Sequence, residues 1–231
     1  MIDSKTSARI AGVLLILGTV PILAAMVLWG QPFLSPDYLS LMAGHSGTIH
    51  LFTLAIMVMG LACAGIGISL YPVLKRHNEG LAVTAMGFRI MEGILQVASA
   101  GFIVYLLALS QEFVKAGSPL DSFYQPAGAA IKAVHEWMST AYLLPFCIGA
   151  SSYYLVFYKA GLIPRWLSVW GLGGILLMLV SVFSGLLSLM DPSSPVLFLL
   201  NMPILVQELV LAFWLIVKGY NYPETTTAQS H

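Results

Sequence analysis

Six apolar runs, each long enough to cross a lipid bilayer, fill most of this chain and leave only short connections between them. They lie at about residues 8–30, 47–74, 80–111, 127–158, 165–189 and 196–218. A helix of roughly 20 apolar residues spans the hydrocarbon core of a bilayer. Only 9% of the residues are charged, which is too few to cover a water-facing surface. The sequence therefore predicts an integral membrane protein.

The runs favour helices rather than barrel strands. Backbone groups in hydrocarbon must be paired within the protein, so only helices and closed barrels span membranes. Barrel strands alternate in polarity over about ten residues, and these runs do not. We predict the all-α class: a polytopic bundle of six transmembrane helices in one domain, residues 1–218, followed by a short polar tail, 219–231.

The basic residues predict how the bundle is oriented. Loops with an excess of Lys and Arg face the cytoplasm. One side carries seven of them: Lys5, Arg9, Lys75, Arg76, Lys159, Arg165 and Lys218. The other side has Lys115 and, just inside the fourth run, Lys132. Both termini are thus expected in the cytoplasm, with the protein in the cell inner membrane. A net charge of zero argues against a nucleic-acid partner.

One segment of the third run, GFRIMEG, carries two charges inside a long apolar stretch. Arg89 and Glu92 lie one helical turn apart, roughly 14 and 18 Å from the cytoplasmic start of the helix. Gln96 and Ser99 continue the series on the same helical face. A charge at the bilayer centre costs at least about 2.5–3.5 kcal/mol, so this polar stripe is predicted to face the interior of the bundle.

Other runs offer partners for this stripe. The fourth run brings His135 and Glu136, expected about 12–14 Å below the outer surface, and the sixth brings Glu208 about 18 Å down. We expect Arg89 to pair with Glu208 or Glu136, and the excess of acids to leave at least one carboxyl protonated. The predicted ligand- or proton-binding residues around a shared cavity are Arg89, Glu92, Gln96, His135, Glu136, Asn201 and Glu208.

Three functions fit these residues. The first is binding or moving a small polar or amphiphilic ligand, a lipid, or protons; a transporter of this size is expected to work as a homodimer. The second is a membrane-embedded metalloenzyme, in which His50, His135 and Glu208 hold zinc or iron. No HExxH motif supports it, because Ser139 and Thr140 follow "HEWM". The third is a structural or regulatory membrane partner without a ligand.

Four segments together resemble one known family. They are "SARIAGVLLI", "GFRIMEGIL", "YKAGLIPRWLSVWG" and "QELVLAFWLIVKGY". The chain resembles, over nearly its whole length, an uncharacterised bacterial family of six-helix membrane proteins, domain of unknown function 4386. The resemblance implies no reaction, substrate or cofactor, and it suggests the motif positions Arg89, Glu92, Gly161, Pro164, Arg165 and Glu208. The "GLIPR" segment is also interpreted as a helix stop followed by a proline helix start.

Overall fold

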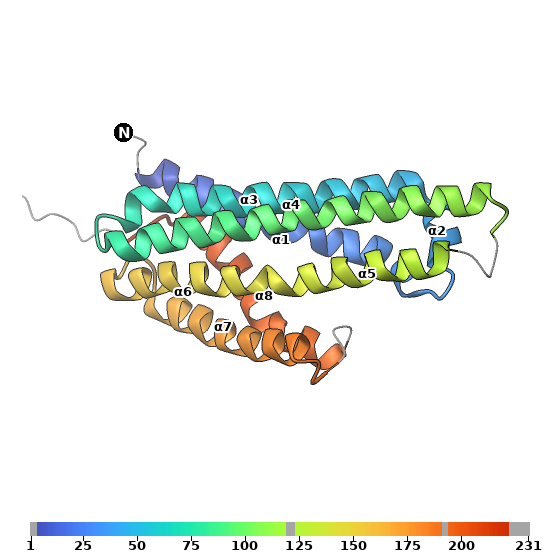
Figure 1. Cartoon of the computed structure of the whole chain (residues 1–231). Coiled ribbons are helices and arrows are strands. Elements are labelled where there is room, and N and C mark those ends of the chain that lie inside the picture. Colours follow the sequence, from blue (N-terminus) through green and yellow to red (C-terminus); the bar gives the residue numbers. More distant parts are fainter. Residues whose placement is uncertain (1–3, 119–122, 191–193, 222–231) are drawn as a thin grey trace, which may run out of the picture.

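The computed structural model describes residues 4–118, 123–190 and 194–221, and these residues form helices joined by turns. The elements follow the predicted runs closely (Figure 1). The eight helices in the described part of the chain are α1 (Ser4–Leu34), α2 (Tyr38–Gly44), α3 (Ser46–Leu74), α4 (Glu79–Lys115), α5 (Tyr124–Ala141), α6 (Leu143–Ala160), α7 (Arg165–Leu186) and α8 (Pro195–Val217).

The membrane character of the chain is carried by long apolar helices. Within the described residues, five helical segments are long and apolar enough to cross a bilayer: α3, α4, the α5–α6 pair, α7 and α8. The chain is therefore a multi-pass membrane protein. The first predicted span coincides with α1, which is 31 residues long and packs against both α3 and α8.

Two elements differ from the prediction. The fourth run forms two helices, α5 and α6, that meet at Tyr142. Pro145 lies in the first turn of α6 and has no N–H to donate to the carbonyl of Ala141. The connection between the first two spans also contains the short helix α2, whose Leu39 and Met42 are buried. With only seven residues, α2 is too short to show a helical pattern of apolar residues in the sequence.

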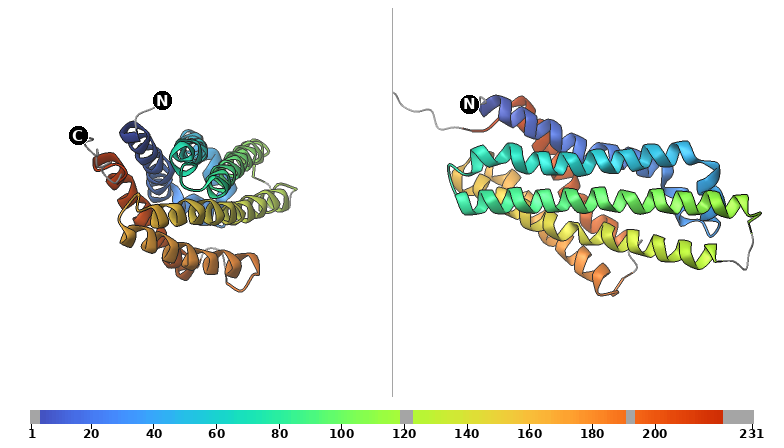
Figure 2. Two further views of the ribbon diagram at one scale, coloured as in Figure 1. Left: turned by 90° about the vertical axis from the view of Figure 1, so that its left-hand side faces the viewer. Right: turned by 45° about the horizontal axis from the view of Figure 1, so that its top comes forward.

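The long helices form a ring of six members, in which α5 and α6 together count as one member and the short helix α2 is left out. Neighbouring pairs in contact are α1 with α3, α3 with α4, α4 with α6, α6 with α7, α7 with α8, and α8 with α1 (Figure 2). In this order α4 and α8 lie opposite one another. Small residues bring neighbours close: a Cβ on Gly60 of α3 would lie 2.7 Å from the backbone oxygen of Gly93 on α4. The ring thus has an interior that side chains of opposite helices can reach.

One end of the bundle is basic. The start of α1, the α3–α4 turn, the α6–α7 turn and the end of α8 all lie at the same end, opposite α2 (Figure 1). These segments carry the seven Lys and Arg residues from which the orientation was predicted. We call this the basic end, and the opposite one the α2 end.

The "GLIPR" segment forms the predicted stop and start at the basic end. Gly161 ends α6 with a positive φ of 64°, which glycine adopts without a Cβ penalty, and the Leu162 N–H donates to the Phe157 carbonyl at 3.1 Å. Pro164 then precedes the first residue of α7. The chain after α8 returns here, because the Asn221 N–H donates to the Leu162 carbonyl at 2.8 Å. Residues 222–231 of the predicted polar tail lie outside the described residues.

The helices are of unequal length, and this sets the depth of the polar residues. At about 1.5 Å per residue, α7 and α8 are roughly 33 and 35 Å long, close to the hydrocarbon thickness, whereas α4 is roughly 55 Å long. At the α2 end of α7, a Cβ on Gly185 would lie 3.6 Å from the Thr140 methyl group. Residues of α5 before Thr140 therefore extend past the end of α7.

Candidate functional site

The site is centred on Arg89, in the first third of the long helix α4. The helix is started by Asn78, whose Oδ1 accepts a hydrogen bond from the Leu81 N–H at 2.9 Å. From there the inward face of α4 carries Arg89, Glu92, Gln96 and Ser99, all buried as the spacing predicted. Arg89 is 1% exposed and lies about 15 Å along α4, near the middle of the apolar zone.

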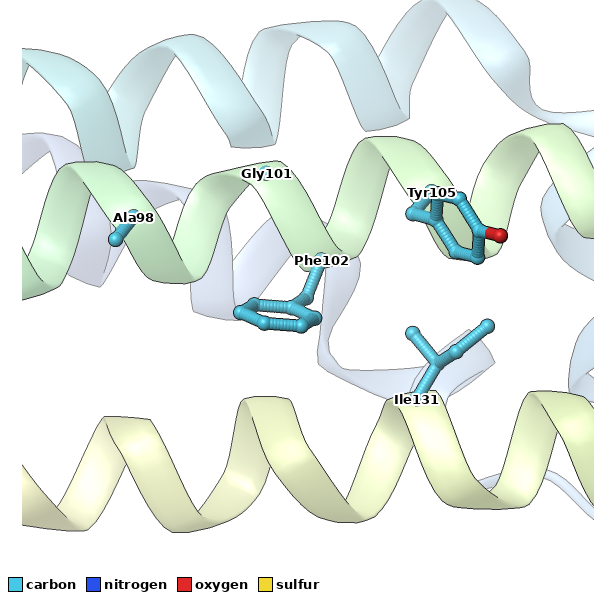
Figure 3. Close-up of a pocket in the computed structure, with 5 residues that line it drawn as sticks. All are labelled: Ala98, Gly101, Phe102, Tyr105 and Ile131. Carbon is cyan, nitrogen blue, oxygen red and sulfur yellow. The ribbon is translucent and has the colours of Figure 1, made fainter.

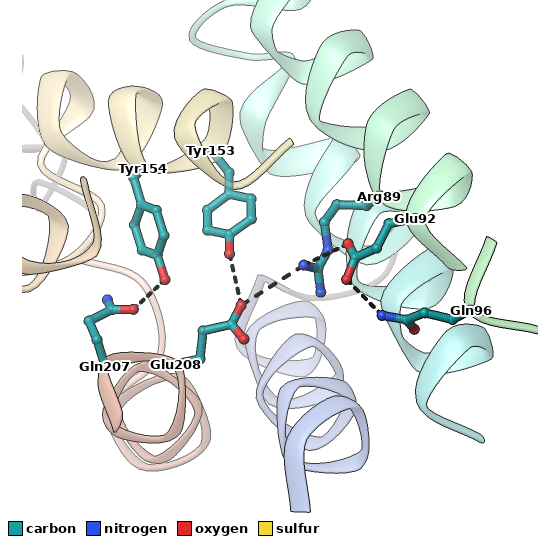
Figure 4. A network of polar contacts seen from close by, with 7 residues as sticks. All are labelled: Arg89, Glu92, Gln96, Tyr153, Tyr154, Gln207 and Glu208. Atoms are coloured by element: carbon teal, nitrogen blue, oxygen red, sulfur yellow. Dashed lines mark hydrogen bonds and ion pairs between the residues drawn. The ribbon is translucent and has the colours of Figure 1, made fainter. Parts of the chain in front are cut away.

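Arg89 reaches two carboxylates, one on its own helix and one across the ring. Its Nη1 lies 2.9 Å from Glu92 Oε2 and 4.0 Å from Glu208 Oε1 on α8 (Figure 4). Glu208 lies about 14 Å from the basic end of α8, which matches the depth of Arg89. The predicted pairing of Arg89 with Glu208 is confirmed, and it forms between helices that do not pack against each other along their length.

Hydrogen bonds extend the cluster on both sides. The Tyr153 hydroxyl of α6 donates to Glu208 Oε1 at 3.2 Å, and Gln96 Nε2 donates to Glu92 Oε1 at 3.2 Å. Next to Glu208, the Tyr154 hydroxyl donates to Gln207 Oε1, and Gln207 Nε2 donates to the Leu167 carbonyl of α7 at 3.0 Å (Figure 4). The polar contacts thus link α4, α6, α7 and α8 through the interior of the ring.

The ring is shaped to hold the arginine side chain. A Cβ added to Gly67 of α3 would lie 3.0 Å from Arg89 Cβ, and one added to Gly149 of α6 would lie 3.2 Å from Arg89 Cγ. The guanidinium lies over the Phe146 ring, 5.1 Å from its centroid, a cation–π contact that helps to keep a desolvated charge. Two glycines and an aromatic ring therefore surround Arg89.

Some buried polar atoms of the cluster lack hydrogen-bond partners. Among the described residues, Arg89 Nε and Gln96 Oε1 make no hydrogen bond with the protein. Unpaired buried polar groups cost about 1–3 kcal/mol each. The hydrogen bonding of the cluster is therefore incomplete at these two atoms.

The other predicted residues of α5 lie near the end of the apolar zone. His135 is half-buried, and its Nδ1 lies 3.2 Å from the Ser99 carbonyl oxygen, next to the polar stripe. Glu136 is exposed and pairs with Lys132 at 3.8 Å, so of the two partners predicted as alternatives for Arg89 the structure has Glu208 and not Glu136. Because α5 extends past the end of α7, these residues lie nearer the α2-end surface than the expected 12–14 Å depth.

The remaining predicted residues stand apart from the cluster. Asn201 lies half-buried on α8, two turns from Glu208 on the same helical face, and its Oδ1 is buried without a hydrogen-bond partner among the described residues. His50 is exposed on α3, where its Nδ1 contacts the Ser46 carbonyl at 2.8 Å.

The structure does not bring together the ligands of the predicted metal site. No group of three or more His, Cys, Asp or Glu side chains in the described residues is arranged to hold a metal ion. His50 contacts its own helix, His135 contacts Ser99, and Glu208 contacts Arg89 and Tyr153. The donor set that zinc or iron requires is therefore not assembled from His50, His135 and Glu208.

A separate pocket of about 380 Å³ lies between α4 and α5 (Figure 3). Its lining is apolar apart from one tyrosine hydroxyl, and it contains none of the predicted site residues. The lining residues are Ala98, Gly101, Phe102, Tyr105 and Ile131. The pocket therefore marks an open seam between these two helices rather than the predicted polar cavity.

Sequence reasoning missed three members of the network. Tyr153 and Tyr154 lie side by side in an apolar run, and tyrosines are common in such runs, so nothing in the sequence set them apart. Gln207 precedes Glu208 directly, and its amide in the middle of a membrane helix was an available signal. All three are fully buried, because hydrogen bonds satisfy their polar groups.

The comparisons with known proteins agree with the resemblance seen in the sequence. Neither the curated proteins nor the solved structures gave a match to this chain. A family model described as "Domain of unknown function (DUF4386)" matches residues 10–219, which include every helix of the ring and every member of the Arg89 network. The chain therefore belongs to the DUF4386 family.

Proposed function

We propose that this protein is a six-span protein of the cell inner membrane, with both termini in the cytoplasm, whose Arg89 cluster binds an exchangeable proton. In this proposal α1 also crosses the membrane, in addition to the five apolar segments named above, which gives six spans. The basic end faces the cytoplasm, in line with the positive-inside rule. The proton is held by the carboxyl groups that share Arg89.

The observation that carries the proposal is a mismatch of charge. One guanidinium is in contact with two carboxyl groups, Glu92 at 2.9 Å and Glu208 at 4.0 Å. With all three ionised, the cluster would hold one excess negative charge in a region where an unpaired charge costs at least about 2.5–3.5 kcal/mol. One added proton removes that charge, so the cluster is balanced when a single carboxyl is protonated.

Glu208 is the better candidate to carry the proton. Glu92 has the shorter contact with Arg89 and also accepts a hydrogen bond from Gln96, so its charge is well compensated. Glu208 lies farther from the guanidinium, and its side chain is 12% exposed, against 4% for Glu92. Its remaining contact is with Tyr153, whose hydroxyl can rotate between donor and acceptor roles.

Polar groups lead from the cluster toward the α2 end. The Gln96 side-chain amide donates to Glu92, the Ser99 hydroxyl donates to the backbone carbonyl of Gln96 at 2.7 Å, and His135 Nδ1 lies 3.2 Å from the backbone carbonyl oxygen of Ser99. Acidic and histidine side chains are typical of proton relays in membrane proteins, and here the two glutamates lie deep while His135 lies nearer the α2-end surface. We infer that the proton exchanges with the medium at this end.

The proposal is tested by infrared difference spectroscopy of the protein in lipid vesicles between mildly acidic and mildly basic pH. The wild type is expected to show the carbonyl band of a protonated carboxyl that disappears as the pH rises. Glu208→Gln removes this band. Glu112→Gln is the matched control, because Glu112 lies on α4 but is exposed and paired with Lys115. A band that persists in both Glu208→Gln and Glu92→Gln contradicts the proposal.

A further inference from the structure

The rod formed by α5 and α6 loses its regular helical hydrogen bonding at one residue, Tyr142, which keeps right-handed helical backbone angles. Tyr142 both ends α5 and precedes α6, and its side chain does not cap α6. Pro145 has no N–H, so it cannot donate the hydrogen bond that would join α6 to the Ala141 carbonyl. A proline inside a helix removes an i to i−4 hydrogen bond and weakens the helix at that point.

The two halves of this rod are held very differently. α6 has 18 residues, and ten of them are buried, among them Tyr153 and Tyr154. α5 is equally long, but Gly128 is its single buried residue. Segments with few buried contacts open at a lower free energy than the core around them. α5 is therefore the half that can move, and α6 is the half that stays in the ring.

The break lies directly beside the Arg89 cluster. Phe146, one turn after Tyr142, lies against the Arg89 guanidinium, which is 5.1 Å from the centroid of its ring. On the α5 side, His135 rests on the carbonyl of Ser99 at the α2 end of the polar stripe. α5 thus covers the route by which Gln96 and Ser99 lead from the cluster toward the surface.

We propose that α5 is a hinged arm that turns at Tyr142 and opens the α2-end access to the Arg89 cluster. When α5 lies against α4, His135 contacts Ser99 and the stripe is covered. When α5 turns away from α4 along the apolar interface that contains the pocket lined by Phe102 and Ile131, Ser99 and Gln96 meet the medium. The movement of α5 does not depend on the proposed function. Only the statement that the opening admits a proton to the Arg89 cluster rests on it.

The motion itself is tested by amide hydrogen–deuterium exchange, read by mass spectrometry on the whole protein in lipid. In the wild type the amides of α5 are expected to exchange at least roughly tenfold faster than those of α6. Pro145→Ala restores the missing N–H and should slow exchange on both sides of the break. Pro72→Ala is the matched control, because Pro72 lies inside α3 at the basic end. Equal exchange of α5 and α6 in the wild type overturns the hinge.

A removable crosslink tests what the hinge controls. In a Cys63→Ala, Cys147→Ala background, Phe102→Cys and Ile131→Cys are joined across the seam by a short bis-methanethiosulfonate reagent. The rate at which the buried carboxyl takes up deuterium, followed by infrared spectroscopy, should fall roughly tenfold and recover when a reductant removes the crosslink. The two single-cysteine variants, treated with the same reagent, should show no change.

The two readouts separate the failure of this inference from that of the proposed function. If the carboxyl band exchanges at the same rate with and without the crosslink, α5 does not control access, although the proton site stands. If no titrating carboxyl band exists, the proton site is wrong, and the amide exchange of α5 still decides whether the arm moves.

Discussion

Arg89 on α4 and Glu208 on α8 belong to opposite helices of the ring, and their side chains meet in its interior, with Nη1 and Oε1 4.0 Å apart. Arg89 reaches this point because Gly67 and Gly149 leave room for its stem. Tyr153 fixes Glu208 from a third helix. The charged cluster therefore holds together helices that have no extended packing surface in common.

The hydroxyl of Tyr154 is predicted to stabilise the bundle through Gln207. Tyr154→Phe removes the donor to Gln207 Oε1 and leaves a buried oxygen unpaired, so the free energy of unfolding should fall by about 1–3 kcal/mol. The measurement is unfolding in detergent micelles titrated with sodium dodecyl sulfate. Tyr105→Phe provides the control, because Tyr105 is 65% exposed and should change stability by less than about 0.5 kcal/mol. Equal effects of the two variants would argue against this hydrogen bond.

The contact between Gly60 and Gly93 predicts a size limit at the α3–α4 interface. Gly60→Ala places a methyl group 2.7 Å from the Gly93 oxygen and should lower the free energy of unfolding by about 1–3 kcal/mol. Gly87→Ala is the matched variant on α4, where an added Cβ meets nothing within 4 Å. It should leave stability unchanged or raise it by up to about 1 kcal/mol, because alanine favours helix. The same unfolding titration checks both, and a harmless Gly60→Ala refutes the close approach.

The N-cap of α4 predicts a smaller effect at the basic end. Asn78→Ala removes the acceptor for the Leu81 N–H and should cost about 0.5–2 kcal/mol of the free energy of unfolding. Asn78→Asp keeps the acceptor oxygen and should stay within about 0.5 kcal/mol of the wild type. Amide exchange of the first turn of α4 localises the effect. Faster exchange in both variants alike would show that the cap is not what starts the helix.

The proposed orientation predicts which turns are reached from each side of the membrane. Alkaline phosphatase, which is active only after export, should be active when fused after Gly117 at the α2 end and inactive when fused after His77 at the basic end. A green fluorescent protein at the C-terminus should fluoresce, because that terminus is placed in the cytoplasm. The reverse pattern of activities would place the basic end outside.

The membrane class, the six long helical runs and the inward stripe of α4 could be predicted from the sequence. Hydropathy depends on each residue alone, and the 3.6-residue period places Arg89, Glu92, Gln96 and Ser99 on one face without knowledge of the rest of the fold. The same period places Asn201 and Glu208 on one face of α8.

What the sequence did not predict depends on how helices are arranged in space. Glu136 and His135 looked deep because the fourth run was taken as one span of membrane length, whereas α5 extends past the end of α7. Pro145 alone was not enough to predict the break at Tyr142, because another proline, Pro203, lies inside α8 and that helix is continuous. The hydrogen bonds of Tyr153 and Gln207 depend on how α6 and α8 are rotated about their axes relative to each other. The sequence of one helix alone does not determine that rotation.

The measurement closest to the central claim is a double-mutant cycle between Arg89 and Glu208. Arg89→Met, Glu208→Gln and the double variant are compared with the wild type by unfolding in micelles, with Arg89→Met and Glu112→Gln as the parallel cycle for an exposed acid on the same helix. We expect a coupling free energy of about 0.5–3 kcal/mol between Arg89 and Glu208, as for groups in direct contact, and close to zero for Arg89 with Glu112. Zero coupling in the first cycle would contradict the account.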